Sequence, residues 1–166
     1  MTVAGKAGRA REDRGGKGGG SGREAASVVA EDLEGRTLRE RAMAAMERAY
    51  APYSSFHVGA ALLGTDGSIT DACNVENAAF PAGTCAERAA LASAIARGVR
   101  TFRTMAIATS AEEPTPPCGM CRQALIEFSP ELEIVSVTRN GKESRWRLSD
   151  LLPHAFTPAS LDRTTD

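Results

Sequence analysis

Three cysteines and a glutamate, at fixed spacings, constrain the fold of this chain more than any other feature. Cys118 and Cys121 are three residues apart and follow a pair of prolines, whereas Cys85 lies well upstream, with Glu87 two residues after it. Side chains at i and i+3 on the first turn of a helix point the same way, so Cys118 and Cys121 can bind one metal ion together. Cys85 is 33 residues before Cys118, far enough to lie on a separate helix across an intervening strand. Two helix N-termini that face each other could then bind one metal ion between them.

This arrangement predicts a catalytic zinc ion. A helix N-terminus favours thiolate over thiol, and three thiolate ligands leave a tetrahedral zinc with one open position. Glu87 and Cys85 can both line the site only if Cys85 lies at the helix boundary, and there Glu87 is placed to move protons. Arg88, three residues after Cys85, is expected to donate to thiolate sulfur and to offset the charge of the three ligands.

Other interpretations of the cysteines explain less of the sequence. A Cys-x-x-Cys pair alone is typical of redox sites or of half a structural zinc site, but the redox interpretation leaves Cys85 and Glu87 unexplained. A structural zinc needs a fourth ligand, and we expect His57 and His154 to be surface or core residues. Cys73 is expected to be a buried thiol. A non-catalytic module held together by zinc remains an alternative, against which Glu87 argues.

Composition excludes several classes of function. The chain has 166 residues, enough for one domain with a real core, and a formal charge of -1, which does not indicate a polyanionic partner. No apolar run approaches the ~20 residues of a membrane span, and the N-terminus has no apolar stretch typical of a signal peptide. We therefore expect no membrane association and a cytoplasmic location, where four cysteines favour metal binding over disulfides.

Residues 1–34 differ from the rest of the chain. Half of the sixteen glycines fall between Gly5 and Gly22, interleaved with lysines and arginines. Because glycine has a large ordering entropy and no side chain to bury, we expect residues 1–34 to be a disordered Gly/Arg-rich arm and residues 35–166 to form the domain. The basic residues could contact nucleic acid or an acidic partner, but a solvated tail is the simpler interpretation, and we expect no nucleic-acid partner.

Apolar periodicity predicts helices that alternate with strands, which indicates an α/β layered domain with at least one parallel strand pair. Turns are expected at Asp66-Gly67 and Asn140-Gly141. The expected strands cover residues 58–63, 68–74, 105–109, 132–138 and 144–148. Four helices are expected. The first covers residues 36–50, the second runs from just after Cys85 to Gly98, the third starts at Cys118, and a short fourth begins near residue 149.

Several further segments belong with the cysteine motifs. They are Ala51–Ser54, Phe56–Leu62, Cys73–Ala78, Cys85–Arg88, Pro117–Gln123 and Leu151–Phe156, spread over about residues 38 to 161. Together they resemble the small homotetrameric, zinc-dependent cytidine deaminases of pyrimidine salvage. The resemblance implies a three-layer α/β/α fold with a mixed central sheet of about five strands, one Zn²⁺ per subunit, and a homotetramer with sites at subunit interfaces. The reaction that it implies is hydrolysis of cytidine and 2′-deoxycytidine to uridine and 2′-deoxyuridine, with release of ammonia.

The resemblance also assigns roles to individual residues. It makes Glu87 the proton shuttle, and Phe80, where the family commonly has tyrosine, is a departure that removes a hydroxyl group. The zinc ligands that it implies are Cys85, Cys118 and Cys121. The substrate contacts that it implies are Asn74 and Glu76 to the ribose hydroxyls, the backbone N–H of Ala86 to the pyrimidine O2, Phe56 beside the base and sugar, and Phe156 across a subunit interface.

Two neighbouring classes of deaminase fit less well. Deaminases of cytosine-containing antibiotics such as blasticidin S share the Cys-Ala-Glu and Pro-Cys-x-x-Cys motifs. They lack the Asn-x-Glu-Asn segment and the arginine after the glutamate, which are present here as Asn74–Asn77 and Arg88. A polynucleotide deaminase needs a basic channel, whereas this domain without its arm is acidic.

Overall fold

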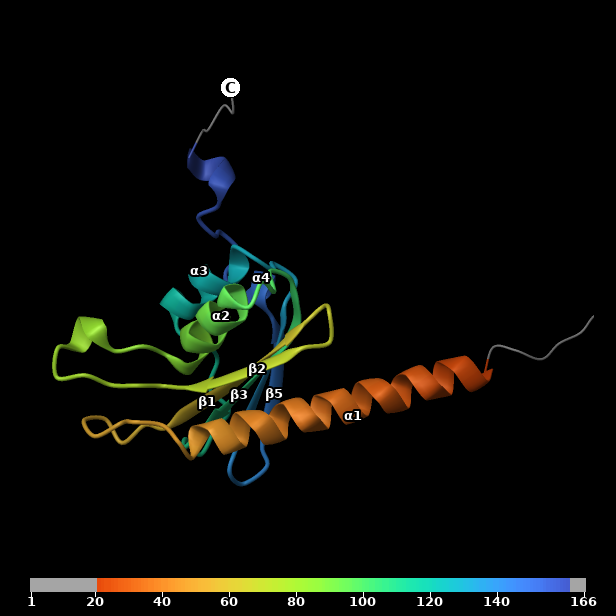
Figure 1. Cartoon of the computed structure of the whole chain (residues 1–166), viewed down its shortest axis with the longest axis horizontal. Helices are drawn as coiled ribbons and strands as arrows, with labels where there is room; N and C mark the ends of the chain where they lie inside the picture. The colour runs from red at the N-terminus through yellow and green to blue at the C-terminus, as the bar shows by residue number, and fades with distance from the viewer. Residues whose placement is uncertain (1–20, 162–166) are drawn as a thin grey trace, which may run out of the picture.

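A five-stranded mixed sheet lies between one long helix and a layer of shorter helices (Figure 1). The computed structural model describes residues 21–161, with side chains from residue 33 onward. The expected three-layer α/β/α fold is confirmed. The elements are α1 (Ser21–Met46), β1 (Val58–Gly64), β2 (Ile69–Cys73), the 3₁₀ turn η1 (Phe80–Ala82), α2 (Ala86–Ala96), β3 (Phe102–Thr109), α3 (Gly119–Ile126), β4 (Glu133–Thr138), β5 (Glu143–Arg147), α4 (Leu148–Leu151) and η2 (Pro158–Leu161).

The strand order β2-β1-β3-β4-β5 places β3 at the centre of the sheet. Among the described strands, β3 and β4 are the parallel pair, and their neighbours pair in the antiparallel sense. Parallel strands need a crossover connection, and α3 supplies it between β3 and β4. This connection brings the start of α3 to the end of the sheet where β3 finishes. The site described below forms at that end.

Both expected turns form where glycine permits them. Gly67 has a φ of 83° between β1 and β2, and Gly141 has a φ of 81° between β4 and β5, a left-handed conformation that glycine adopts without strain. Asp66 also accepts hydrogen bonds from the backbone N–H of Ser68 at 3.0 Å and from its hydroxyl at 2.7 Å. The expected strands and turns are therefore confirmed, with ends that differ by a few residues.

The helix α1 covers one face of the sheet. Leu38, Ala42 and Met46 are buried against small residues of the strands, among them Ala61 and Ala106. The opposite face carries the larger core, in which Met105, Ile107 and Ile134 of the strands pack beneath α2 and α3, against residues such as Leu125 of α3. Within residues 21–161, no helix combines the length and the apolar character that crossing a bilayer requires.

One predicted boundary was wrong. We expected order to begin near Arg36, but α1 begins at Ser21 and includes part of the segment assigned to the arm. The sequence between these positions contains alanine, glutamate and leucine, which have high helix propensity, and this outweighs the glycine bias further upstream. The helix also ends at Met46, earlier than expected. The remainder of the predicted arm, residues 1–20, lies outside the described residues.

Candidate metal centre and active site

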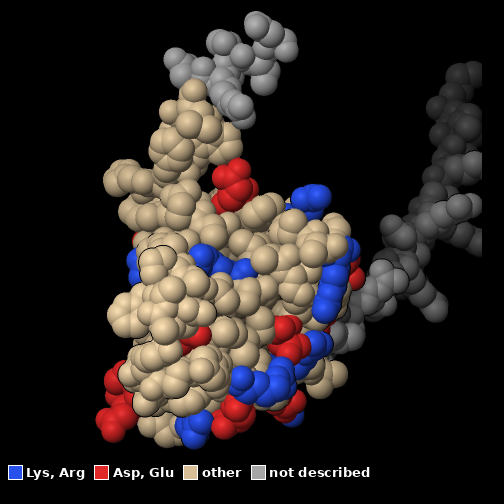
Figure 2. All heavy atoms as spheres, turned by 60° about the vertical axis from the view of Figure 1, so that its left-hand side comes forward, with Lys and Arg blue, Asp and Glu red and all other residues tan. Residues whose placement is uncertain are grey.

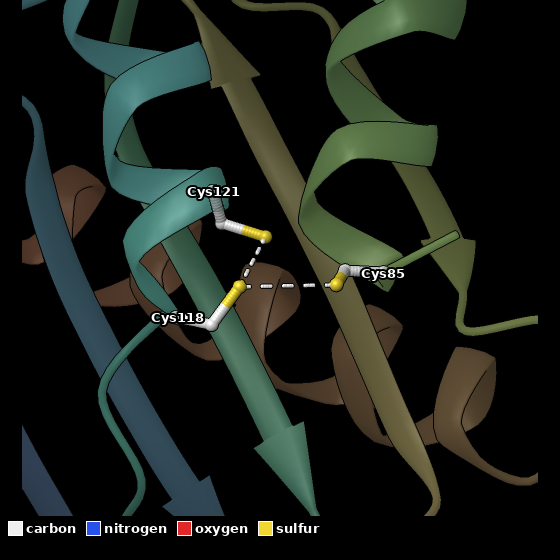
Figure 3. Close-up of side chains that lie close together, drawn as sticks. All are labelled: Cys85, Cys118 and Cys121. Carbon is white, nitrogen blue, oxygen red and sulfur yellow. Dashed lines mark hydrogen bonds between the residues drawn. The ribbon is translucent and has the colours of Figure 1, made fainter. Parts of the chain in front are cut away.

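Two helix starts bring the three cysteine side chains together. Cys85 is the N-cap residue of α2 and Cys118 is the N-cap residue of α3, both with extended backbone angles. Cys121 lies on the first turn of α3. Figure 3 shows the three sulfur atoms directed toward one another across the gap between the helices. Because Cys85 lies at the helix boundary, as expected, its side chain and that of Glu87 can both reach the same space.

The separations between the sulfur atoms fit a bound zinc ion. The Sγ atoms of Cys85 and Cys118 are 3.9 Å apart, and those of Cys118 and Cys121 are 3.5 Å apart. Two thiolates bound tetrahedrally at a Zn–S distance of about 2.3 Å would lie about 3.8 Å apart. All three Sγ atoms lie within 4.8 Å of one another, and these cysteines form the cluster suited to a metal among the described residues. Three soft sulfur donors in this geometry suit one zinc ion.

Within the cluster, the thiol of Cys85 is the one polarised toward thiolate. The pKa of the Cys85 thiol is lowered to about 5. The largest cause is a hydrogen bond from Cys121; Arg88 acts in the same direction, and burial opposes both. The same hydrogen bond raises the pKa of Cys121, which is fully buried. The Arg88 guanidinium donates to the carbonyl oxygen of Gly83 at 3.3 Å, while its buried Nε has no partner. Arg88 contributes to the lowered pKa of Cys85, and its expected hydrogen bond to a thiolate sulfur stays a prediction.

Glu87 is a buried carboxyl group at the start of α2. Only 5% of the residue is exposed. Burial raises the pKa of Glu87, and the negative charge of Cys85 adds to the effect. A buried carboxyl group whose pKa is raised holds a proton more readily than an exposed one, which favours a role in general acid–base chemistry.

A cavity of about 660 Å³ opens beside the cysteines. This volume suits a ligand of small-molecule size. The cavity connects nearly all the residues to which the sequence assigned a role in the site. Those that line it are Phe56, Asn74, Glu76, Cys85, Ala86, Glu87, Arg88 and Cys118. Cys121 is buried behind the cavity wall, and Phe156 lies outside the cavity with 58% of the residue exposed.

Asn74 and Glu76 face the cavity but also hold the loop between α1 and β1. The side chain of Asn74 accepts a hydrogen bond from the Val58 N–H at 2.9 Å and donates one to the Phe56 carbonyl oxygen at 2.9 Å. Glu76 accepts from the Tyr53 N–H at 2.9 Å and from the hydroxyl of Ser54. These bonds fix the loop that carries the Phe56 ring into the cavity.

Sequence reasoning missed several polar residues of the cavity wall, among them Thr109. Thr109, the last residue of β3, lines the cavity, and its buried hydroxyl has no hydrogen-bond partner among the described residues. A threonine at the end of a buried strand gives no signal in the sequence, because nothing shows that the strand ends beneath a cavity.

The rim of the cavity is apolar and exposed. The ring of Phe80, with the residue 77% exposed, packs edge-on against Tyr53 with ring centroids 6.2 Å apart. Met120 and Val75 also line the cavity and are exposed. Figure 2 brings forward the end of the molecule that carries η1 and the loop before β1, and uncharged side chains predominate there. An exposed, uncharged rim of this kind suits contact with another protein surface.

Residues 34–137 match the family described as the cytidine and deoxycytidylate deaminase zinc-binding region. The chain belongs to this deaminase family. A protein from Sporosarcina psychrophila named cytidine deaminase is 42% identical over 118 residues, which cover 70% of this chain and 87% of that protein. Another cytidine deaminase, from Halalkalibacterium halodurans, is 39% identical over 131 residues, which cover 78% of this chain and 99% of that protein.

A solved structure of a deaminase of the family agrees with the fold. The cytidine deaminase from Burkholderia pseudomallei superposes with a TM-score of 0.70 at 48% identity, and the match covers 73% of this chain and 98% of that chain. A blasticidin-S deaminase from Bacillus cereus is 29% identical over 109 residues, which cover 61% of this chain and 77% of that protein. The deaminase chain described here is thus more similar to the named cytidine deaminases than to the antibiotic deaminase.

Proposed function

We propose that this protein is a zinc-dependent deaminase that hydrolyses cytidine, and also 2′-deoxycytidine, to the uracil nucleoside and ammonia. The observation that carries the proposal is the placement of the buried carboxyl group of Glu87 beside three converging cysteine sulfurs at the wall of one cavity. Relatives named cytidine deaminase, at 38–48% identity, support the choice of substrate.

Cys85, Cys118 and Cys121 are the residues that would hold the zinc ion. When bound, zinc supplies a Lewis acid that lowers the pKa of a water molecule. Glu87 takes the proton from that water and passes it to N3 of the cytosine ring, which makes C4 electrophilic. After the water oxygen has bonded to C4, Glu87 takes the second proton of that water from the C4 hydroxyl and delivers it to the exocyclic amine. The C4–N bond then breaks, and the amine leaves as ammonia.

Other residues of the cavity hold the nucleoside in place. We assign Asn74 and Glu76 to the ribose hydroxyls, above all the 3′-OH, since both face the cavity from the segment that follows β2. The backbone N–H of Ala86 donates to O2 of the pyrimidine, and the Phe56 ring packs beside the base and sugar. A contact centred on the 3′-OH is common to ribose and 2′-deoxyribose, so both nucleosides fit these assignments.

We further propose a homotetramer in which Phe156 of one subunit completes the cavity of the next. Phe156 is exposed and lies outside the cavity of its own chain, and the cavity rim exposes Phe80, Met120 and Val75. Burying such a rim between subunits removes apolar surface from water and shields the reacting groups. A role in pyrimidine salvage and a cytoplasmic location, both predicted from the sequence, belong to the same proposal.

Replacement of Glu87 tests the proposed reaction. Glu87→Gln keeps the size of the side chain but removes its ability to accept a proton, so kcat should fall by about 10²–10⁴ or more while zinc stays bound. The loss of cytidine absorbance in the ultraviolet measures turnover, and metal analysis measures zinc. Glu127→Gln, at an exposed position just after α3, is the matched control and should keep full activity.

The same assay separates the rival functions. Zinc-loaded wild-type protein that turns over blasticidin S but not cytidine would establish the antibiotic deaminase instead. A folded, zinc-loaded protein inactive on both substrates would favour the non-catalytic zinc module. Near-normal turnover by Glu87→Gln would contradict the assignment of the proton shuttle.

A further inference from the structure

Arg122 contacts the turn that presents Cys118 through both its side chain and its backbone. Its Nε donates to the carbonyl oxygen of Pro117 at 2.7 Å. Its backbone N–H donates to the carbonyl oxygen of Cys118 at 3.0 Å. These two carbonyl groups belong to the peptide units immediately before and after Cys118. The Arg122 side chain therefore holds the peptide unit before Cys118, while the unit after it is held by an ordinary backbone bond of α3.

The same guanidinium reaches the C-terminal part of the chain. Its other nitrogen, NH1, donates to the carbonyl oxygen of Leu151 at 2.8 Å, and Leu151 is the last residue of α4. Carbonyl groups in the last turn of a helix have no partner within the helix, and arginine commonly binds them. Next to Arg122, the Gln123 amide donates to the Phe156 carbonyl oxygen at 2.7 Å. The start of α3 and the segment from α4 to Phe156 are thus joined at two points.

The geometry of this link requires arginine. The two carbonyl oxygens lie on separate segments, and the guanidinium is planar, with several N–H groups in a fixed arrangement that can serve both at once. A lysine ammonium could donate to either oxygen but would hold neither peptide plane in a fixed orientation. Arg122 is partly buried and does not line the cavity, so it contacts the metal-binding turn but not the substrate.

We propose that Arg122 is a positioning residue for the zinc site: it holds the Pro117–Cys118 turn in the conformation that presents the thiolate and anchors that turn to the C-terminal segment. The proposal rests on the assignment of Cys85, Cys118 and Cys121 as zinc ligands. Residues that orient metal ligands typically contribute 10- to 100-fold to metal affinity, so loss of this arrangement should appear first as loss of metal retention.

The rate of zinc release to a chromophoric chelator tests the proposal without any substrate. Arg122→Gln should release zinc about tenfold faster or more than the wild type, and Arg122→Lys should fall between them. Arg39→Gln removes a partly exposed arginine from α1, on the other side of the sheet, and should release zinc at the wild-type rate. Should Arg122→Gln fail to fold, Arg122→Lys carries the test.

Two further readouts separate positioning from a general loss of stability. The melting temperature of Arg122→Gln should fall more in the zinc-loaded form than in the zinc-free form, because weaker metal binding stabilises the folded state less. In assay buffer with low zinc, kcat should fall while KM for cytidine is unchanged, and added zinc should restore kcat. The proposal would be overturned if Arg122→Gln lowered the melting temperature equally in both forms and released zinc at the wild-type rate.

Failure of the ligand assignment would look different. A folded wild-type protein that binds no zinc overturns that assignment and this proposal with it. A wild-type protein that binds one zinc ion, with Arg122→Gln releasing it no faster, overturns only the role given to Arg122. Faster release from Arg39→Gln as well would also overturn it, because the effect would then belong to any lost arginine.

Discussion

The hydroxyl of Thr109 is a buried polar group without a partner. Thr109 ends β3, and along this strand Met105, Ile107 and Thr109 alternate onto the face that packs beneath α2 and α3. The residue is only 1% exposed, and its Oγ1 has no hydrogen bond within the described structure. An unpaired buried hydroxyl costs about 1–3 kcal/mol, because its hydration is lost without replacement.

Replacement of Thr109 by valine should therefore stabilise the protein. Valine has nearly the same shape without the hydroxyl, and we expect the free energy of unfolding to rise by about 1 kcal/mol. Denaturant unfolding of the zinc-loaded forms measures it. Thr70→Val, at a buried position on the edge strand β2, is the comparison. The Thr70 hydroxyl is not among the buried unpaired groups of the described residues, so no gain is expected. A loss of stability in Thr109→Val would mean that the hydroxyl has a partner.

At the scale of elements, the contact between α1 and β1 depends on Gly59, which has no side chain. A Cβ atom on Gly59 would lie 2.0 Å from the carbonyl oxygen of Ala42 and 2.3 Å from the backbone nitrogen of Met46. Both are helix backbone atoms, which cannot move aside as a flexible side chain can. The glycine therefore lets the helix lie directly against the strand.

Gly59→Ala should force α1 away from the sheet. We expect a loss of about 3 kcal/mol or more in the free energy of unfolding, at the upper end of overpacking effects. Urea denaturation measures it. Gly119→Ala is the control, since a Cβ there meets nothing within 4 Å, and it should change stability little. Equal stability of Gly59→Ala and the wild type would show that α1 is not packed as described.

Asp71 ties the edge strand β2 to α1 by charge. Its carboxylate accepts from the Arg41 Nε at 2.9 Å and from Arg48 at 2.9 Å. Burial alone would raise the pKa of Asp71, but hydrogen bonds and charge from the two arginines outweigh it and lower the pKa below its ordinary value. A carboxyl group of this kind stabilises the fold above its unfolded-state pKa, and this contribution disappears as the pH falls through the folded-state pKa.

Asp71→Asn should remove this contribution. Because both arginines are substantially exposed, we expect a loss of about 0.5–1 kcal/mol near neutral pH. The difference between variant and wild type should shrink below the ordinary aspartate pKa of 3.8. Unfolding by urea at a series of pH values checks both points, and a difference that does not change with pH would contradict the electrostatic origin.

The elements themselves could be predicted because their signals are local. The turn at Asp66-Gly67, the alternation of strands and helices, and the helix starts at Cys85 and Cys118 all follow from residues close together in the sequence. The start of α1 was missed because glycine bias upstream and helix propensity downstream conflict. The close approach at Gly59 and the unpaired hydroxyl of Thr109 depend on packing between distant segments, which periodicity does not show.

Some parts of the site could be predicted from the sequence and others could not. The cysteine spacing and the position of Glu87 were sufficient to expect the cluster, because two helix N-termini are the simplest way to bring these side chains together. The link from Arg122 to the carbonyl of Leu151 was not predictable, since it joins two backbone oxygens that no side-chain pattern marks. The roles of Asn74, Glu76 and Phe156 toward a nucleoside remain predictions.

At the scale of the whole molecule, the proposed tetramer can be tested by mixing defective subunits. Glu87→Gln lacks the proton shuttle in its own cavity, and Phe156→Ala lacks the ring proposed to enter a neighbouring cavity. If Phe156 acts across an interface, mixed assemblies contain some cavities with both groups intact. Activity should then exceed the sum of the two variants assayed alone.

Two controls belong to this experiment: sedimentation of the wild type, and a comparison of conditions that allow or prevent subunit exchange. The wild type should sediment as a tetramer, and the gain in activity should require conditions that allow subunits to exchange. A mixture no more active than its parts, with exchange shown by a tagged subunit, would contradict a contribution of Phe156 across the interface. A monomeric wild type with full activity would contradict the tetramer itself.

The position of the cysteines on either side of β3 has a consequence for how the protein matures. Cys85 precedes this central strand and Cys118 follows it, and β3 is paired with both β1 and β4. A zinc ion bound by all three cysteines therefore closes a loop of the chain around the central strand, so metal binding and folding are coupled. Because the ion binds the folded chain, it adds to the stability of that chain by mass action.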